Sequence, residues 1–306
     1  MELSAATELL QIAEEAAAEP VRITSCEEAV ELEAAVAAKP PVTAATIAHD
    51  ALVGIPTGDA EEDQLYQFQS LHVSVPPQSR VVSLTERESL GAEKFRFLAV
   101  RLQQLRQRRP LKKVLITSTV PQEGKSTVAA NLASALARRA QQKTLLLEGD
   151  LRRASLAQLL GLGKLSGISE WLKGDSDGRT SIYHLEGSGL CILPAGNAVD
   201  NPLELMQSAR LPPLMEQLTT WFDWIVIDSP PVLPLADTSI WMRLADGILL
   251  VTRQGATEKQ QLKKGLEVIE SSKLLGALLN SSRGVANGDY YKYYSARQSS
   301  GAAVAR

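Results

Sequence analysis

The feature that most constrains this chain is the sequence Gly-Lys-Ser-Thr at residues 124–127, which lies between an apolar run of strand type and an Ala-rich helical stretch. Backbone N–H groups at the start of such a helix form an anion site, and a glycine there lets the backbone approach a phosphate. The lysine can reach the outer phosphates of a nucleotide, and the serine hydroxyl can hold Mg²⁺. This order predicts a nucleotide-binding loop made of Pro121, Gln122, Glu123, Gly124, Lys125, Ser126 and Thr127.

Short apolar runs alternate with helical stretches after residue 110, at residues 114–118, 144–148, 190–194, 224–228, 247–251 and 274–280. Strands this short and this apolar are typical of a parallel sheet that helices cover on both faces. The pattern therefore predicts an α/β fold of the P-loop NTPase type with a mostly parallel sheet. The chain has 306 residues, of which 44% are hydrophobic, so it can bury a core of ordinary size.

Two of these runs end in acidic side chains. One leads into Glu148 and Asp150, and the other ends at Asp228. Ligands of a parallel sheet lie at the carboxyl ends of its strands, so these carboxylates are expected to converge on the phosphates at the loop. There Ser126, Asp150 and Asp228 would offer Mg²⁺ the oxygen ligands that it prefers. A single Asp at a strand end is more often a turn or a helix cap, but the loop and both acidic strand ends in order are less accidental.

Charge divides the chain into two unequal parts. Residues 1–85 carry 14 acidic and 3 basic side chains, whereas the remainder carries 21 acidic and 29 basic ones. The first part is rich in Ala and Glu, is interrupted by prolines and has no sustained apolar period, so it is predicted to be largely disordered. After it we expect a basic amphipathic helix that could serve in oligomerisation (86–110), the P-loop domain (111–282) and a flexible tail (283–306).

Composition also argues against several classes of protein. The total of 32 basic against 35 acidic side chains is not that of a protein basic along its whole length, and we expect no nucleic-acid partner. The first ten residues lack the basic start and apolar run of a secretory signal, and no 18-residue apolar stretch occurs, so we expect no membrane span. Cys26 and Cys191 supply neither a disulfide framework nor a metal-ligand spacing, which favours a reducing cytoplasm.

The order of these motifs resembles that of the BY-kinases, the bacterial tyrosine autokinases of the capsule and exopolysaccharide type. Residues 118–127 match the first motif of that family, S-x-x-P-x-E-G-K-S-T. Residues 145–153 resemble its second motif, a strand followed by D-x-D-L-R-R, and residues 224–231 resemble its Walker B strand. The resemblance covers about residues 86–294.

The resemblance implies an ATP-dependent protein-tyrosine autokinase that transfers the γ-phosphate in trans to tyrosines of the C-terminal tail and regulates exopolysaccharide or capsule synthesis or export. The implied acceptors are Tyr290, Tyr291, Tyr293 and Tyr294. It also implies a transmembrane activator of the chain-length-regulator kind as partner, and self-assembly into a homo-oligomer, with a ring as one form. The location it implies is cytoplasmic, at the inner face of the plasma membrane through that partner.

The chemistry of such a transfer gives each site residue an expected role. A tyrosine hydroxyl has an unperturbed pKa of about 10, so near pH 7 its proton must be accepted or its oxygen held in line with the γ-phosphate. We expect Lys125 and Mg²⁺, which Ser126, Asp150 and Asp228 would hold, to neutralise the phosphates of ATP. Asp150 or Glu148 is expected to accept the tyrosine proton.

Some positions depart from the family patterns. Glu148 replaces the first aspartate of D-x-D, which moves the carboxylate outward by roughly 1.5 Å and predicts weaker activity. Ala99 occupies the third position of the helix motif E-x-x-R-x-x-R, which weakens the expectation of a ring. Asn280 ends a strand where related P-loop ATPases bind the adenine edge, although its amide suits a plain strand-end cap equally well.

Two other functions fit the same fold. A positioning ATPase of the MinD/ParA kind is one, but the early lysine of its KGGxGK[ST] loop is absent here, where Thr119 and Val120 stand. An ATP-binding regulatory scaffold with weak or no transfer activity is the other, because Glu148 replaces an aspartate. The H-R-D, D-F-G and G-x-G-x-x-G sequences of eukaryotic-type kinases are missing, so any kinase activity must use P-loop chemistry.

Overall fold

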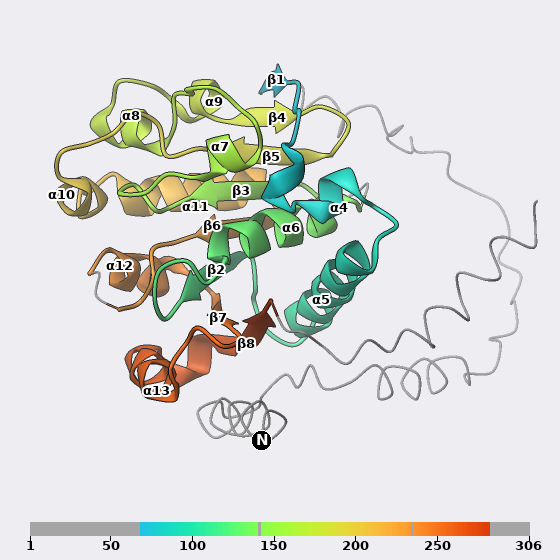
Figure 1. Cartoon of the computed structure of the whole chain (residues 1–306). Coiled ribbons are helices and arrows are strands. Elements are labelled where there is room, and N and C mark those ends of the chain that lie inside the picture. The colour runs from blue at the N-terminus through green and yellow to red at the C-terminus, as the bar shows by residue number, and fades with distance from the viewer. Residues whose placement is uncertain (1–67, 140–141, 234–235, 282–306) are drawn as a thin grey trace, which may run out of the picture.

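The computed structural model describes residues 68–139, 142–233 and 236–281. The strands of this part are β1 (Gln69–Leu71), β2 (Lys113–Ser118), β3 (Thr144–Glu148), β4 (Tyr183–Leu185), β5 (Leu190–Leu193), β6 (Trp224–Asp228), β7 (Gly247–Arg253) and β8 (Leu274–Asn280). They form one sheet in the order β1-β4-β5-β3-β6-β2-β7-β8 (Figure 1). Neighbouring strands pair in parallel except β4 and β5, which are antiparallel. The prediction of a mostly parallel sheet is confirmed.

Helices cover both faces of this sheet. The helices are α4 (Val82–Thr85), α5 (Leu90–Arg106), α6 (Lys125–Ala137), α7 (Leu156–Leu159), α8 (Ile168–Lys173), α9 (Gly178–Ser181), α10 (Pro202–Met206), α11 (Leu211–Trp221), α12 (Asp237–Leu244) and α13 (Lys259–Val268), with 3₁₀ turns η2 (Pro77–Ser79) and η3 (Ser271–Lys273). One core contains side chains of α5, α6 and α7, and the other contains side chains of α8, α10, α11, α12 and α13. None of the described helices combines the length and the apolar character needed to cross a lipid bilayer.

Continuous apolar runs form the central strands because those strands are buried on both sides. In β3, Leu145 and Leu147 belong to one core, whereas Leu146 belongs to the other, together with Leu132 and Leu136 of α6. Successive side chains of a strand point to opposite faces, so a strand between two helical layers needs an apolar residue at every position. This explains why these strands lack the polar alternation of a half-exposed sheet.

The register of the sheet gathers strand ends along one edge. Glu148 at the end of β3 pairs with Asp228 at the end of β6, and Asp228 also pairs with Ile116 of the central strand β2. The chain leaves β2 after Ser118 and enters α6 at Lys125. The predicted loop and the predicted acidic strand ends therefore lie at the same edge of the sheet.

The structure corrects the predicted end of the N-terminal segment. Residues 68–85, predicted to be largely disordered with the rest of residues 1–85, form β1, η2 and α4 of the folded domain. Phe68 is buried and its ring lies 6.1 Å from that of Trp221 and 5.8 Å from that of Phe222, and Val81 is fully buried. The prediction was wrong here because only a few apolar residues of this segment pack on the domain, and so few residues give no periodic pattern in the sequence. Residues 1–67 lie outside the described residues.

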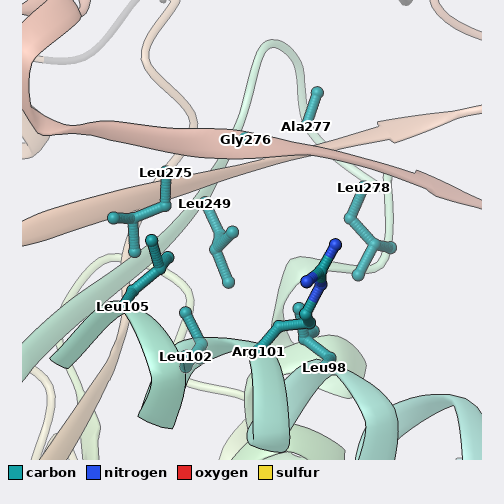
Figure 2. A pocket seen from close by; sticks show the side chains of 9 residues that line it. All are labelled: Leu98, Arg101, Leu102, Leu105, Leu249, Leu275, Gly276, Ala277 and Leu278. Carbon is teal, nitrogen blue, oxygen red and sulfur yellow. The ribbon is translucent and has the colours of Figure 1, made fainter. Parts of the chain in front are cut away.

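A helix occupies most of the segment predicted as residues 86–110. This helix, α5, begins after Ser89, whose hydroxyl accepts a hydrogen bond from the N–H of Ala92 at 3.2 Å. Figure 2 shows Leu98, Leu102 and Leu105 of α5 facing Leu249 of β7 and Leu275 and Leu278 of β8. The apolar face of α5 therefore covers the last two strands of the sheet, while Phe97 and Val100 are exposed on its outer face.

Candidate nucleotide-binding and phosphotransfer site

The loop between β2 and α6 has a backbone that favours glycine at its last position. Gly124 has φ of 91°, and a Cβ atom on it would collide with the amide nitrogen of Asn280. Its carbonyl accepts the first bond of α6, from the N–H of Val128 at 3.0 Å. Pro121 and Gln122 are exposed, whereas Thr127 is half-buried in the first turn of α6. This is the helix start that the sequence predicts for binding phosphate, because the first N–H groups of an α-helix have no partner within the helix itself.

Two contacts from distant segments hold this loop. The carboxylate of Glu123 is buried and accepts hydrogen bonds from the N–H of Val120 at 2.9 Å and from the hydroxyl of Thr257. The carbonyl of Glu123 accepts the amide N–H of Asn280 at 2.9 Å, while the amide oxygen of Asn280 accepts the N–H of Ser281 at 2.8 Å. Glu123 and Asn280 therefore fix the loop from the end of β8 and from the turn after β7. Adenine binding by Asn280 stays a prediction.

The lysine and serine of the loop lie beside the predicted acids. Nζ of Lys125 is 3.6 Å from Oδ2 of Asp150, and the two side chains are 15% and 6% exposed. The other carboxylate oxygen of Asp150 accepts the N–H of Arg153 at 3.0 Å. The hydroxyl of Ser126 accepts a hydrogen bond from the hydroxyl of Ser155 at 3.2 Å. The structure thus brings Lys125, Ser126 and Asp150 together as the sequence predicts.

Asp228 is the most unusual group of the site. Its side chain is fully buried, and within the described part of the chain neither carboxylate oxygen has a hydrogen-bond partner. Burial raises the pKa of Asp228 to about 7, although the nearby Lys125 ammonium and Ser126 hydroxyl act in the opposite direction. A buried carboxylate without partners is costly unless a cation balances it. Asp228 is therefore suited to a cation that binds between it and the loop.

The residues around Asp228 fit a magnesium ion. Asp228, Asp150 and the Ser126 hydroxyl are hard oxygen donors, which Mg²⁺ prefers. Among the residues that the structure describes, no group of three or more His, Cys, Asp or Glu side chains is arranged to hold a metal by itself. Mg²⁺ in nucleotide sites usually takes only one or two carboxylates and completes its shell with water and phosphate oxygens, so two carboxylates and a hydroxyl suffice.

Glu148 is bound to the backbone on all sides. Its buried carboxylate accepts the N–H groups of Ser155, Leu156 and Ala195, the last two at 2.6 and 3.0 Å. Burial raises the pKa of Glu148, and the three N–H bonds oppose that rise. The predicted proton acceptor thus lies at the site, but its oxygens are engaged by the segments after β3 and β5.

Several residues that shape the site were not singled out from the sequence. The indole N–H of Trp241 donates to the carbonyl of Gly149 at 3.0 Å. Nε and Nη2 of Arg152 donate to the two oxygens of the buried Asp237 at 2.6 and 3.2 Å. Both contacts bind the segment after β3 to α12, across more than 80 residues of sequence. Asp237 begins a helix, and that local signal predicts only a favourable helix start, not its distant partner.

Gly149 lies so close to Trp241 that a side chain does not fit. A Cβ atom at Gly149 would lie 2.7 Å from the indole ring. We expect Gly149→Ala to lower the free energy of unfolding by about 1–3 kcal/mol, because the buried Trp241 side chain must shift to make room for the added methyl group. Gly163→Ala is the matched control, since nothing lies within 4 Å of its Cβ, and it should change stability by less than about 0.5 kcal/mol. Equal urea midpoints for the two variants would contradict this packing argument.

The fold and the loop together define a P-loop protein of the α/β class. No family model matches the chain. Tyrosine-protein kinase YwqD of Bacillus subtilis (strain 168) is 34% identical over 219 residues, which are 71% of this chain and 92% of that protein. Succinoglycan biosynthesis transport protein ExoP of Rhizobium meliloti (strain 1021) is 31% identical over 243 residues, 78% of this chain and 30% of that protein. The crystal structure of the chimerical protein CapA2B2 has a TM-score of 0.63 and 31% identity, and the match covers 74% of this chain and 100% of that one.

The chain belongs to the family of bacterial tyrosine-protein kinases. The resemblance inferred from residues 118–127, 145–153 and 224–231 is thereby confirmed. The predicted phosphoacceptors Tyr290, Tyr291, Tyr293 and Tyr294 lie outside the described residues, and so does the whole predicted tail, residues 283–306.

Proposed function

We propose that this protein is an ATP-dependent tyrosine autokinase that phosphorylates its own C-terminal tail in trans. The observation that carries the proposal is the buried, unpartnered carboxylate of Asp228 beside Lys125 at the start of α6. A lysine at a helix N-terminus next to a buried carboxylate that lacks a hydrogen-bond partner suits a triphosphate with its cation. Membership of the bacterial tyrosine kinase family supports the choice of acceptor.

In this proposal the loop and Lys125 bind the phosphates of ATP. The N–H groups at the start of α6 and the Lys125 ammonium hold the β- and γ-phosphates, so Lys125 shifts part of its interaction from Asp150 to phosphate. Ser126, Asp150 and Asp228 would hold Mg²⁺, which when bound supplies positive charge to the phosphates. These groups are placed before the reaction begins, which is how phosphoryl-transfer sites lower the barrier.

The transfer of the γ-phosphoryl group to tyrosine needs no reactant besides ATP and the tyrosine hydroxyl. The tyrosine oxygen forms a bond to the γ-phosphorus, the bond between that phosphorus and the bridging oxygen of ADP breaks, and ADP leaves with the bonding electron pair. The tyrosine proton passes to a carboxylate of the site, because a hydroxyl with an ordinary pKa of about 10 is otherwise a weak nucleophile. Asp150 and Glu148 are the carboxylates that the sequence motif supplies.

The proposal extends to location and partner. ExoP is named a succinoglycan biosynthesis transport protein, and this chain matches only 30% of its length. The name of this relative supports a link of our protein to exopolysaccharide or capsule synthesis, and with it a transmembrane activator of the chain-length-regulator kind as partner. We place the protein in the cytoplasm at the inner face of the plasma membrane through that partner, as a homo-oligomer. Co-purification from membranes with and without a candidate activator tests this placement.

One experiment separates the proposed function from its alternatives. The full chain is incubated with ATP and Mg²⁺, with and without the activator, and phosphate is located by mass spectrometry. Phosphate on the tail supports the kinase. Free phosphate without protein phosphorylation would instead support a positioning ATPase. Neither product in either sample would indicate a regulatory scaffold.

Transfer in trans predicts a specific result for mixed variants. Lys125→Met with an intact tail is mixed with a chain in which Tyr290, Tyr291, Tyr293 and Tyr294 are all replaced by Phe. We expect phosphate on the Lys125→Met chain, because the second chain supplies the active site and the first supplies the acceptors. A tail held near a neighbouring site reaches an effective concentration that can be in the mM range. Labelling of wild-type protein without labelling in the mixture would show transfer in cis.

A further inference from the structure

Glu148 occupies the end of β3 and binds two separate segments at once. Its Oε1 atom accepts the N–H groups of Ser155 and Leu156, and its Oε2 atom accepts the N–H of Ala195. The side chain is 1% exposed. A carboxylate offers about four acceptor sites, and three of them are occupied here by backbone donors. Such charge-assisted bonds are the strong ones, so this carboxylate fixes whatever it binds.

One of the two bound segments carries the phosphotransfer groups. The chain leaves β3 at Glu148, passes through Asp150 and returns to Glu148 at Ser155, so one side chain closes both ends of this turn. The hydroxyl of Ser155 donates to that of Ser126 at 3.2 Å. A continuous path of hydrogen bonds therefore runs from Glu148 through Ser155 to the loop residue that would hold the metal.

The other bound segment follows the neighbouring strand. Ala195 comes directly after β5, which pairs with β3 in parallel. Glu148 thus spans from the start of α7 to the segment after β5. An aspartate is shorter by one methylene, roughly 1.5 Å. From the same backbone it would stretch bonds of 2.6 and 3.0 Å well beyond hydrogen-bonding distance on at least one side. The glutamate is the length that this bridge requires.

We propose that Glu148 is a positioning residue that holds Ser155, and through it Ser126, and that it does not accept the tyrosine proton. This inference rests on the proposed function. Both oxygens of Glu148 already accept backbone N–H groups, and these three bonds hold the site together. Of the two carboxylates that the sequence motif supplies, Asp150 faces Lys125, and a backbone N–H engages only one of its oxygens. With glutamate in place of aspartate, the first position of the D-x-D motif holds the site in place and takes no part in the proton transfer.

The two roles of Glu148 predict opposite orders of activity for its variants. As a base, Glu148→Asp would keep activity and Glu148→Gln would lose about 10²–10⁴-fold. As a positioning residue, Glu148→Gln keeps one oxygen for the N–H groups of Ser155 and Leu156 but loses the bond to Ala195, because an amide nitrogen cannot accept. We expect it to lose at most about tenfold, whereas Glu148→Asp loses more. Asp150→Asn should lose at least about 10²-fold in kcat. An active Glu148→Asp together with an inactive Glu148→Gln would overturn the proposal.

Binding and exchange measurements test the bridge without any phosphotransfer. In the full chain, hydrogen exchange at the amides of Ser155 and Leu156 should be faster in Glu148→Asp and near wild type in Glu148→Gln. The affinity for a non-hydrolysable ATP analogue should fall about tenfold in Glu148→Asp, because Ser126 loses its support. Unchanged exchange and affinity in Glu148→Asp would overturn the proposal even if the protein proves not to be a kinase.

Glu170 offers a matched control for general loss of structure. Its carboxylate accepts the N–H groups of Gly167 at 2.7 Å and of Asn197 at 2.9 Å, so it also holds the segment after β5. It has no bond to the turn between β3 and α7 in the contacts that the structure gives for it. Glu170→Gln should lower thermal stability with nucleotide affinity unchanged. If it weakens nucleotide binding as much as Glu148→Asp does, the effect is not specific to Glu148.

Discussion

Replacing Lys125 with methionine is expected to lower the rate of tail phosphorylation by about a thousandfold. Methionine keeps most of the length of the side chain but removes the ammonium that faces Asp150 at 3.6 Å and the bound phosphates. Loss of one preorganised charge at a transferring phosphoryl group has effects of about this size. The initial rate of ³²P incorporation into the full chain, at saturating ATP, measures the effect.

An exposed lysine elsewhere provides the comparison for this variant. Lys164 lies in the loop after α7 and is exposed, so Lys164→Met should leave the rate within about twofold of wild type. Melting curves of both variants confirm that each is folded. A Lys125→Met protein that is folded and keeps more than a tenth of the wild-type rate would contradict the assigned role of Lys125.

Replacing Asp228 with asparagine should abolish transfer and at the same time stabilise the ligand-free protein above pH 7. The unfolded chain ionises this carboxyl near its ordinary pKa of 3.8, whereas burial raises the pKa of the folded protein to about 7. Unfolding therefore releases a proton between these values, and the free energy of unfolding falls as pH rises through this window. The difference between the two pKa values of Asp228 lowers the free energy of unfolding by at most about 4 kcal/mol above pH 7.

The asparagine variant removes this pH-dependent cost but keeps a buried polar group. An unpartnered amide itself costs about 1–3 kcal/mol, so the net gain at pH 8 should be a few degrees in melting temperature. Near pH 4 the advantage should vanish, because Asp228 is then mostly protonated in the folded protein. Melting temperatures of wild type, Asp228→Asn and the exposed control Asp200→Asn, measured without nucleotide from pH 4 to pH 8, check this. A constant difference across the range would contradict the raised pKa of Asp228.

The elements that carry the phosphate chemistry were predictable because their signals are local. A strand, a glycine at φ of 91° and a helix that begins at Lys125 follow each other within a few residues. The rule that parallel strands present their carboxyl ends at one edge then places Asp150 and Asp228 near that helix start. The local motifs and this rule were therefore enough to predict that these residues lie close together.

The supporting contacts were not predictable because their partners are remote in sequence. Either Asp150 or Glu148 was expected to accept the tyrosine proton, and no local signal predicted that Glu148 also binds Ala195, which is 47 residues away. Asn280 was expected either to bind adenine or to cap its strand end, and its amide donates to the carbonyl of Glu123, 157 residues away, while adenine binding stays a prediction. The boundary expected at residue 85 also lay too far along the chain, since Phe68 packs on Trp221 and Phe222. No short pattern encodes such pairs.

The amino-acid sequence alone determined the α/β fold, the phosphate-binding loop and the set of acids that face it, because apolar periodicity and helix starts depend on neighbours along the chain. Only the tertiary structure decided which of those acids is bound by the backbone and which is left for a cation. Among the described residues Asp228 has no hydrogen-bond partner, whereas Glu148 is bound by three N–H groups, although both end apolar strands. The difference arises from which backbone donors the packed segments bring within about 3 Å of each carboxylate.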